Sequence, residues 1–167
     1  MVRLDLKDAY LVVPIHPSHR KYLQFQWSGV TYHFSALPFG LSSAPWCFTK
    51  LLRPVVSYLR TLGVRLIIYL DDILLLSQSR TTLLQHLQST VSLLESLGFV
   101  INQEKSLLSP TQSLEFLGFV ADSSLCSLQL PGSSLAVIRK ELSLLLQASH
   151  ISLRHLARIV GLLASSI

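Results

Sequence analysis

The sequence has few of the features that define disulfide-rich, zinc-binding or membrane proteins. Its two cysteines, Cys47 and Cys126, lie far apart and form no CxxC pair, so we expect small core residues rather than a zinc site or a disulfide. None of the six histidines has the HExxH spacing. No apolar run reaches the roughly 18 residues of a membrane span, because Arg65, Asp71 and Asp72 interrupt the best candidate. The N-terminus shows no signal peptide, so we expect an intracellular protein, in cytoplasm or nucleus, with no membrane partner.

What is present indicates a globular protein with an unusual placement of acids. The chain has 167 residues, 50% of them apolar, which is enough for one domain with a real core. Its net charge of +5 fits a polyanionic partner. Four of the five aspartates stand in two places: Asp5 with Asp8, and Asp71 with Asp72. Aspartates grouped in apolar surroundings of a basic chain indicate a divalent-cation site that faces a phosphate-rich ligand.

The hydrophobic pattern predicts a mixture of strands and helices. We expect strands at 2–6, 22–27, 30–37, 64–69, 73–77, 99–109 and 113–120, and helices at 45–62, 79–97, 133–148 and 152–164. Ser28-Gly29 predicts a hairpin turn, and Pro54 implies a kink or break in its helix. Ser133 and Ser152 are candidate caps of the last two helices. Because the order is not a regular βαβ alternation, we expect an α+β fold, with an antiparallel sheet that carries helices on one face.

Asp71 and Asp72 interrupt an apolar run and admit two interpretations. They could form a solvated turn, although two-residue hairpin turns favour glycine-containing pairs and this pair has none. They could instead hold metal, since phosphoryl transfer uses carboxylates that place two ions about 3.5–4 Å apart. Asp5 is equally open to two interpretations: a metal ligand on a neighbouring strand, or an edge-strand residue facing water.

Five segments, in order, resemble the motifs of a reverse transcriptase palm of the retroviral and LTR-retrotransposon type. They are "RLDLKDAYLVVPIHP", "YHFSALPFGLSSAPWCFTKLL", "IIYLDDILLLS", "INQEKS" and "LEFLGFV". Within that group, "ALPFGLSSAPWCFTKLLRPV" and "ISLRHLARIVGLLAS" are most similar to DIRS-like elements. The resemblance implies a palm over residues 1–130, with fingers absent or only partial, and the start of a thumb or connection region over 131–167.

The resemblance also implies a catalytic centre. Asp5, Asp71 and Asp72 match the ligands of two Mg²⁺ ions, with Mn²⁺ as a substitute, and Lys105 matches a proton donor near the pyrophosphate. The implied activity is RNA-directed DNA polymerisation by two-metal phosphoryl transfer, which adds deoxynucleotides to a primer 3′-hydroxyl. On composition alone, Lys105 would be an ordinary surface charge.

The remaining matches concern substrates. The resemblance places the incoming deoxynucleoside triphosphate against Lys7, Asp8, Ala9, Tyr10, Leu37, Pro38, Phe39 and Gly40. Tyr10 matches the steric gate that excludes a 2′-OH, although Tyr10 and Phe39 could simply be core aromatics. It places the primer of an RNA or DNA template-primer against Tyr69, Leu70, Leu117 and Gly118, although "LGF" could be a strand with a glycine bulge.

Two rival interpretations stay open. The chain begins four residues before Asp5 and has no basic fingers segment for the triphosphate, so we expect a fragment of a longer polyprotein whose other regions would be partners. Such a fragment could be an inactive remnant that acts as a nucleic-acid-binding or interaction module. A telomerase-like or group II intron-type enzyme is disfavoured, because it would carry F/YADD where this chain has Tyr69-Leu70-Asp71-Asp72.

Overall fold

The computed structural model describes residues 1–148 and 150–164, which fall into two compact units, Met1–Thr111 and Gln112–Ile167. The expected C-terminal segment 131–167 therefore includes four residues, 149 and 165–167, that lie outside the described part. Within the described ranges, no helix is both long and apolar enough to cross a membrane.

A four-stranded antiparallel sheet forms the centre of the first unit. Its spatial order is β4 (Arg65–Tyr69), β5 (Asp72–Leu76), β1 (Val2–Lys7) and β6 (Val100–Ile101). Alternate residues of β1, Val2, Leu4 and Leu6, are almost fully buried, because successive side chains of a strand point to opposite faces. The expected α+β class with an antiparallel sheet is confirmed.

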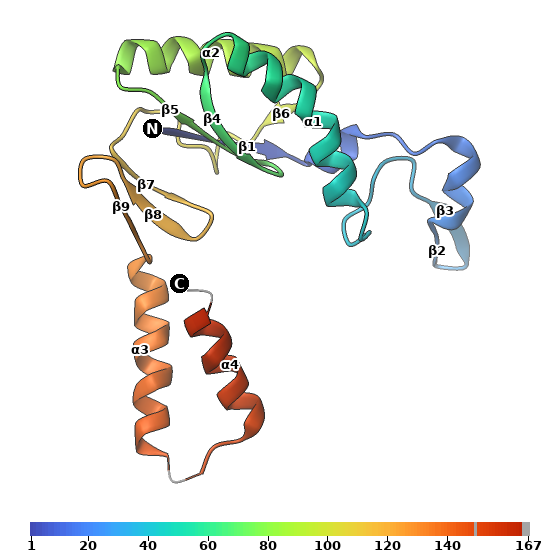
Figure 1. Ribbon diagram of the computed structural model, residues 1–167. Helices are drawn as coiled ribbons and strands as arrows, with labels where there is room; N and C mark the ends of the chain where they lie inside the picture. Colours follow the sequence, from blue (N-terminus) through green and yellow to red (C-terminus); the bar gives the residue numbers. More distant parts are fainter. Residues whose placement is uncertain (149, 165–167) are drawn as a thin grey trace. The chain divides into compact units, whose positions relative to one another are not determined.

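Two helices, α1 (Ala44–Thr61) and α2 (Arg80–Ser96), cover the same face of this sheet (Figure 1). The predicted helices match them closely. Of the kink or break predicted at Pro54, the break is wrong, since α1 continues through this residue. Proline removes only one backbone donor, and the apolar stripe of α1 is buried on both sides of Pro54, at Phe48 and Leu59. Ser79 caps α2, and its side chain accepts a hydrogen bond from the backbone of Thr82.

A second, two-stranded sheet pairs β2 (Gln24–Trp27) with β3 (Val30–His33) around the expected Ser28-Gly29 turn, and it projects beyond the main sheet (Figure 1). Both turn residues have positive φ, 49° and 77°. The predicted strand at 30–37 is too long. Residues 35–37 leave β2 and pair with 13–15 instead, through a donation from Ile15 N to Ser35 O and from Leu37 N to Val13 O.

The segment after α2 is less regular than predicted. Of the expected strand at 99–109, only β6 is a strand, and it pairs with the end of β1. A turn over Asn102–Ser106 then brings Leu107 back to β1, where it bridges Arg3. Backbone pairing with β1 therefore holds both ends of a loop that the apolar pattern treated as one strand.

The second unit contains β7 (Ser113–Phe116), β8 (Phe119–Asp122), β9 (Ser127–Gln129), α3 (Gly132–Gln147) and α4 (Leu153–Ala164). The single strand predicted at 113–120 is wrong: Leu117 and Gly118 have φ of 50° and 81° and turn the chain into a hairpin. Ser133 does not cap α3, whose N-cap is Pro131. The Ser152 cap is confirmed, since its hydroxyl accepts a hydrogen bond from the His155 backbone.

Candidate functional site

The pairing of β1 with β5 brings the three predicted metal ligands together. Asp5 lies directly opposite Asp72 in the antiparallel register. Asp71 precedes Asp72, and its carbonyl accepts a 3.0 Å hydrogen bond from the backbone N–H of Leu6. Opposed residues of antiparallel strands have Cβ atoms about 4.5–5.5 Å apart. The pairing of β1 with β5 therefore brings Asp5 next to Asp71 and Asp72, which are 66 and 67 residues away in the sequence.

The hairpin between β4 and β5 turns at Leu70-Asp71, not at the Asp71-Asp72 pair. Asp72 is the first residue of β5 and pairs with both Asp5 and Tyr69. Leu70 has φ of 55°, a left-handed conformation that costs a bulky residue about 1–3 kcal/mol. The interpretation of both aspartates as a solvated turn is therefore wrong for Asp72, which belongs to the sheet.

The three carboxylates crowd one another electrostatically. Asp5 is 8% exposed, and Asp71 and Asp72 are half-buried. Burial raises the pKa of Asp72, and the negative charges of Asp71 and Asp5 raise it further, while Arg3 and Lys105 lower it. Burial and like charge thus disfavour the ionised form of Asp72. A bound cation would offset both effects.

A network of hydrogen bonds holds the segment Asn102–Ser106 beside Asp5. The backbone N–H of Asp5 donates to the Ser106 hydroxyl at 3.0 Å, and the N–H of Asn102 donates to the Asp5 carbonyl at 2.8 Å. Arg3 donates from Nη2 to the carbonyl of Lys105 at 2.8 Å. The exposed Lys105 is thereby kept near Asp72, whose pKa it lowers. The structure brings this predicted residue to the carboxylates.

The sequence interpretation missed Arg3 and Ser106. Arg3 stands two positions before Asp5, so strand periodicity places both on one face of β1, and this signal was available. Ser106 had no comparable signal, because its bond to Asp5 depends on how the loop after β6 folds back onto β1.

The three neighbouring carboxylates could hold a divalent cation that also binds substrate. Among residues 1–148 and 150–164, no set of three or more His, Cys, Asp or Glu side chains could hold a metal ion. Mg²⁺, however, is ordinarily held by one or two carboxylates, with water and substrate phosphates completing its shell. Asp5, Asp71 and Asp72 supply the hard oxygen donors that such an ion takes, and their mutual repulsion favours it.

Tyr10 follows β1 in a short 3₁₀ turn, Ala9–Val12, that begins after Asp8 in a left-handed conformation (φ 51°). Lys7 and Asp8 are exposed, whereas Ala9 and Tyr10 are buried. Burial raises the pKa of the Tyr10 hydroxyl, and Asp71 and Tyr69 raise it further. The hydroxyl of Tyr10 therefore lies close enough to Asp71 to feel its charge.

Phe39 is the exposed member of a group of three aromatic rings, which also contains Tyr10 and Phe48. The ring of Tyr10 lies 5.2 Å from Phe39 and 5.1 Å, edge-on, from Phe48 in the core. Phe39 is 65% exposed, so it is not a core aromatic, whereas Leu37 and Pro38 before it are buried. Gly40 has φ of 85° and open space around it, a conformation that favours glycine.

The four residues predicted to contact primer fall in two places. Tyr69, 58% exposed, and Leu70 lie at the tip of the hairpin that carries Asp71. Leu117 and Gly118 form the turn between β7 and β8 in the second unit and are exposed. The structure brings the first two to the carboxylates and describes the other two within their own unit.

Comparisons with known proteins agree on one family. The family model "Reverse transcriptase (RNA-dependent DNA polymerase)" matches residues 1–121. The chain is 29% identical over 117 residues to the "Retrovirus-related Pol polyprotein from transposon gypsy" of Drosophila melanogaster, and the match covers 70% of the chain and 11% of that protein. It is 32% identical to the Gag-Pro-Pol polyprotein of Human T-cell leukemia virus 2, with 70% and 9% covered. The chain thus spans about a tenth of the length of these relatives.

Solved structures show the same fold. The foamy viral protease-reverse transcriptase dRH in complex with double-stranded DNA matches 96% of this chain and 26% of its own, with a TM-score of 0.82 and 23% identity. The foamy viral enzyme in complex with an RNA/DNA hybrid matches 96% and 20%, with a TM-score of 0.79 and 25% identity. The palm fold expected from the sequence is confirmed.

Proposed function

Since the chain belongs to the reverse transcriptase (RNA-dependent DNA polymerase) family, of the retrotransposon and retroviral type, we propose that it forms a catalytic palm that adds deoxynucleotides to a primer 3′-hydroxyl. The observation that carries the proposal is the pairing of Asp5 with Asp72, beside Asp71, at one end of the sheet. Proteins of this family use divalent metal. Further regions of a longer polyprotein would be partners of this palm.

In this proposal, Asp5, Asp71 and Asp72 hold two Mg²⁺ ions, for which Mn²⁺ can substitute. The ions would neutralise phosphate charge and activate the primer hydroxyl. The rest of catalysis would come from positioning. Pairing with β1 fixes the hairpin tip, and Lys105, whose carbonyl accepts a hydrogen bond from Arg3, would protonate the leaving pyrophosphate. The raised pKa of Asp72 supports a cation at this position.

The incoming deoxynucleoside triphosphate would lie over the turn after β1. Lys7 and the backbone of Asp8, Ala9 and Tyr10 would face it, and Tyr10 would act as the steric gate. Phe39 and Gly40 would line the opposite side. The support is the contact between the rings of Tyr10 and Phe39 and the influence of Asp71 on the pKa of Tyr10.

The primer end of an RNA or DNA template-primer would rest on Tyr69 and Leu70 and be gripped by Leu117 and Gly118. We further propose that residues 1–130 act as the palm and 131–167 begin a thumb or connection region. The kinship to DIRS-like elements and the intracellular location, in cytoplasm or nucleus, are parts of the same proposal.

Primer extension on an RNA template tests the catalytic role. We expect Asp71→Asn to abolish Mg²⁺-dependent extension in the chain or in any longer protein that contains it, because a neutral amide binds the ion poorly. Asp122→Asn, which changes a half-buried aspartate of β8, is the matched control and should extend normally. Undiminished extension by Asp71→Asn would reject the assignment.

A stability measurement separates the enzyme from an inactive nucleic-acid-binding remnant. We expect millimolar Mn²⁺ or Mg²⁺ to raise the thermal unfolding midpoint of the wild-type chain, since a ligand that binds only the folded state stabilises it. Asp72→Asn should remove this shift. A wild-type midpoint that does not respond to either ion would favour the binding module.

A further inference from the structure

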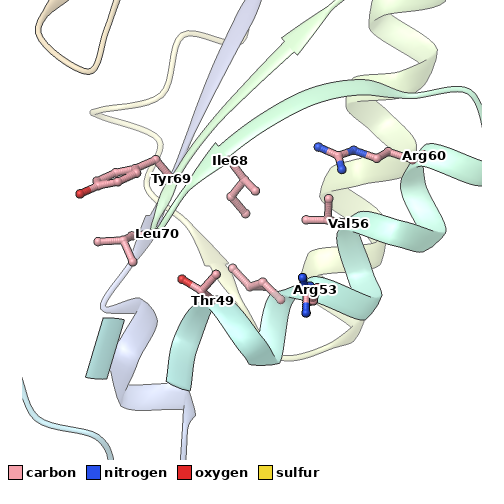
Figure 2. A pocket seen from close by; sticks show the side chains of 8 residues that line it. Thr49, Arg53, Val56, Arg60, Ile68, Tyr69 and Leu70 are labelled. Atoms are coloured by element: carbon pink, nitrogen blue, oxygen red, sulfur yellow. The ribbon is translucent and has the colours of Figure 1, made fainter. Parts of the chain in front are cut away.

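A groove between α1 and the tip of the β4–β5 hairpin lies next to the carboxylates, and of its lining residues only Tyr69 and Leu70 belong to the site described above. It encloses about 390 Å³ and is lined by Thr49, Leu52, Arg53, Val56, Arg60, Ile68, Tyr69 and Leu70. Figure 2 shows Arg53, Val56 and Arg60 on α1 facing Ile68 on β4 across it. A neighbouring hollow of about 460 Å³ shares Arg53, Val56 and Arg60, so the groove continues along the helix.

The charge along this groove is of one sign. α1 contains no Asp or Glu, and its basic residues Lys50, Arg53 and Arg60 are spaced so that they share one side of the helix. Lys50 lies 5.4 Å from the exposed Trp46 ring, one turn earlier. Arg60 donates a 3.4 Å hydrogen bond to the carbonyl of Leu66, which orients it across the groove. Within the described part of the chain, the recorded ion pairs include neither Arg53 nor Arg60.

We infer that this groove binds the sugar-phosphate backbone of the nucleic-acid strand that reaches the carboxylates, an inference that rests on the proposed function. Guanidinium groups bind phosphate oxygens in a bidentate manner, and Arg53 and Arg60 are both exposed. Leu52 and Val56 line the groove from the buried core. Tyr69 and Leu70 line both the groove and the hairpin tip, so a strand in the groove continues directly to Asp71.

The spacing of the arginines favours a strand over a free nucleotide. Arg53 and Arg60 are seven residues apart, or about 10.5 Å along the helix axis. A nucleic-acid strand presents a phosphate about every 3.4 Å of helix axis, so it offers separate phosphates to the two arginines. Neither cavity includes a glycine, the residue that allows a backbone to approach a single phosphate group closely.

Binding of a fluorescent DNA primer annealed to an RNA template, measured by anisotropy across a salt series, tests this inference. We expect Arg53→Gln and Arg60→Gln each to lower the slope of log affinity against log salt by about one, and the double variant to bind about tenfold or more weakly near 0.1 M salt. Arg53→Lys, which keeps the charge, should retain most of the slope. Arg80→Gln, an exposed arginine at the start of α2, is the matched control and should bind as wild type does.

The outcomes separate this inference from the proposed function. If the wild-type chain binds the duplex with a salt-dependent affinity and both glutamine variants match it, the groove does not bind the strand, while the polymerase assignment stands. If the arginine variants weaken binding of a fluorescent deoxynucleoside triphosphate and not of the duplex, the phosphate belongs to the nucleotide and the inference is wrong. If the wild-type chain binds no duplex at all, the inference is also overturned, and primer extension by Asp71→Asn and its control decides separately on the catalytic carboxylates.

Discussion

Two carboxylates in the two units of this protein experience opposite environments. Asp72 lies on the central sheet, where burial and its neighbours Asp71 and Asp5 raise its pKa. Glu141, on α3, accepts a 2.8 Å hydrogen bond from His155 and lies 3.1 Å from Arg158, and this hydrogen bond and the nearby positive charges lower its pKa. The fold keeps Asp72 in surroundings that disfavour its ionised form. The ionised form of Glu141, in contrast, helps to stabilise the packing of α3 on α4. Such opposite shifts distinguish an acid that lies among like charges from one that has hydrogen-bonding and cationic partners.

The two units also differ in what stabilises them. In the first, a cluster of apolar side chains, including Leu4, Phe48 and Leu94, is almost completely buried between the sheet and its helices. In the second, α3 and α4 bury few side chains, Glu141 and Ile159 among them. The apolar core of the first unit determines the strand register and can therefore hold Asp5 opposite Asp72 despite their like charge. The helices α3 and α4 depend more on polar contacts.

Breaking the apolar core should have the largest effect. Leu4→Ala removes a fully buried side chain of β1, and we expect it to lower the free energy of unfolding by about 2–5 kcal/mol. Urea denaturation measures this change. Leu62→Ala, at a 51% exposed position after α1, should cost far less. Equal losses from the two substitutions would show that the core does not dominate the first unit.

Breaking the polar contacts of Glu141 should have a smaller, local effect. Glu141→Gln keeps the shape of the side chain but removes the charge that pairs with His155 and Arg158. We expect faster amide hydrogen exchange in α3 and α4 and little change in β1 and β5. Exchange that accelerates equally in the sheet would contradict the separation of the two units.

Lowering the pH should reproduce that substitution. Because the pKa of Glu141 is lower in the folded than in the unfolded state, its contribution to stability is complete above the ordinary carboxyl pKa of about 4.3 and is lost as the pH falls through the folded value. Amide exchange in α3 and α4 should therefore accelerate in this acid range, after correction for the intrinsic rate. The Glu141→Gln variant should lack this additional acceleration.

Relieving the crowded acids should give the smallest effect, and one of opposite sign. With a chelator present, we expect Asp72→Asn to raise the thermal unfolding midpoint slightly, because one of three neighbouring negative charges is gone. Asp122→Asn should lower the midpoint instead, since the carboxylate of Asp122 accepts hydrogen bonds from Ser124 and Leu125 and its pKa is lowered. A loss of stability in Asp72→Asn would mean that its carboxylate already has a favourable partner.

The amino-acid pattern alone determined the elements whose signal is local. Helical periodicity predicted α1 and α2 almost to their ends, and alternation predicted β1 with Asp5 on its polar side. The order of the motifs also identified the family, because that order is a property of the sequence itself.

Tertiary structure decided the features that depend on pairing between distant segments. The pairing of β5 with β1 places Asp72 in a strand and leaves Leu70-Asp71 as the turn, a register that depends on contacts between distant segments and not on local propensity. Pairing with β1 likewise reduced the predicted strand at 99–109 to β6 and placed Ser106 against Asp5. The groove beside Arg53 and Arg60 exists only because α1 packs next to the hairpin tip, and no periodicity within either segment contains that contact.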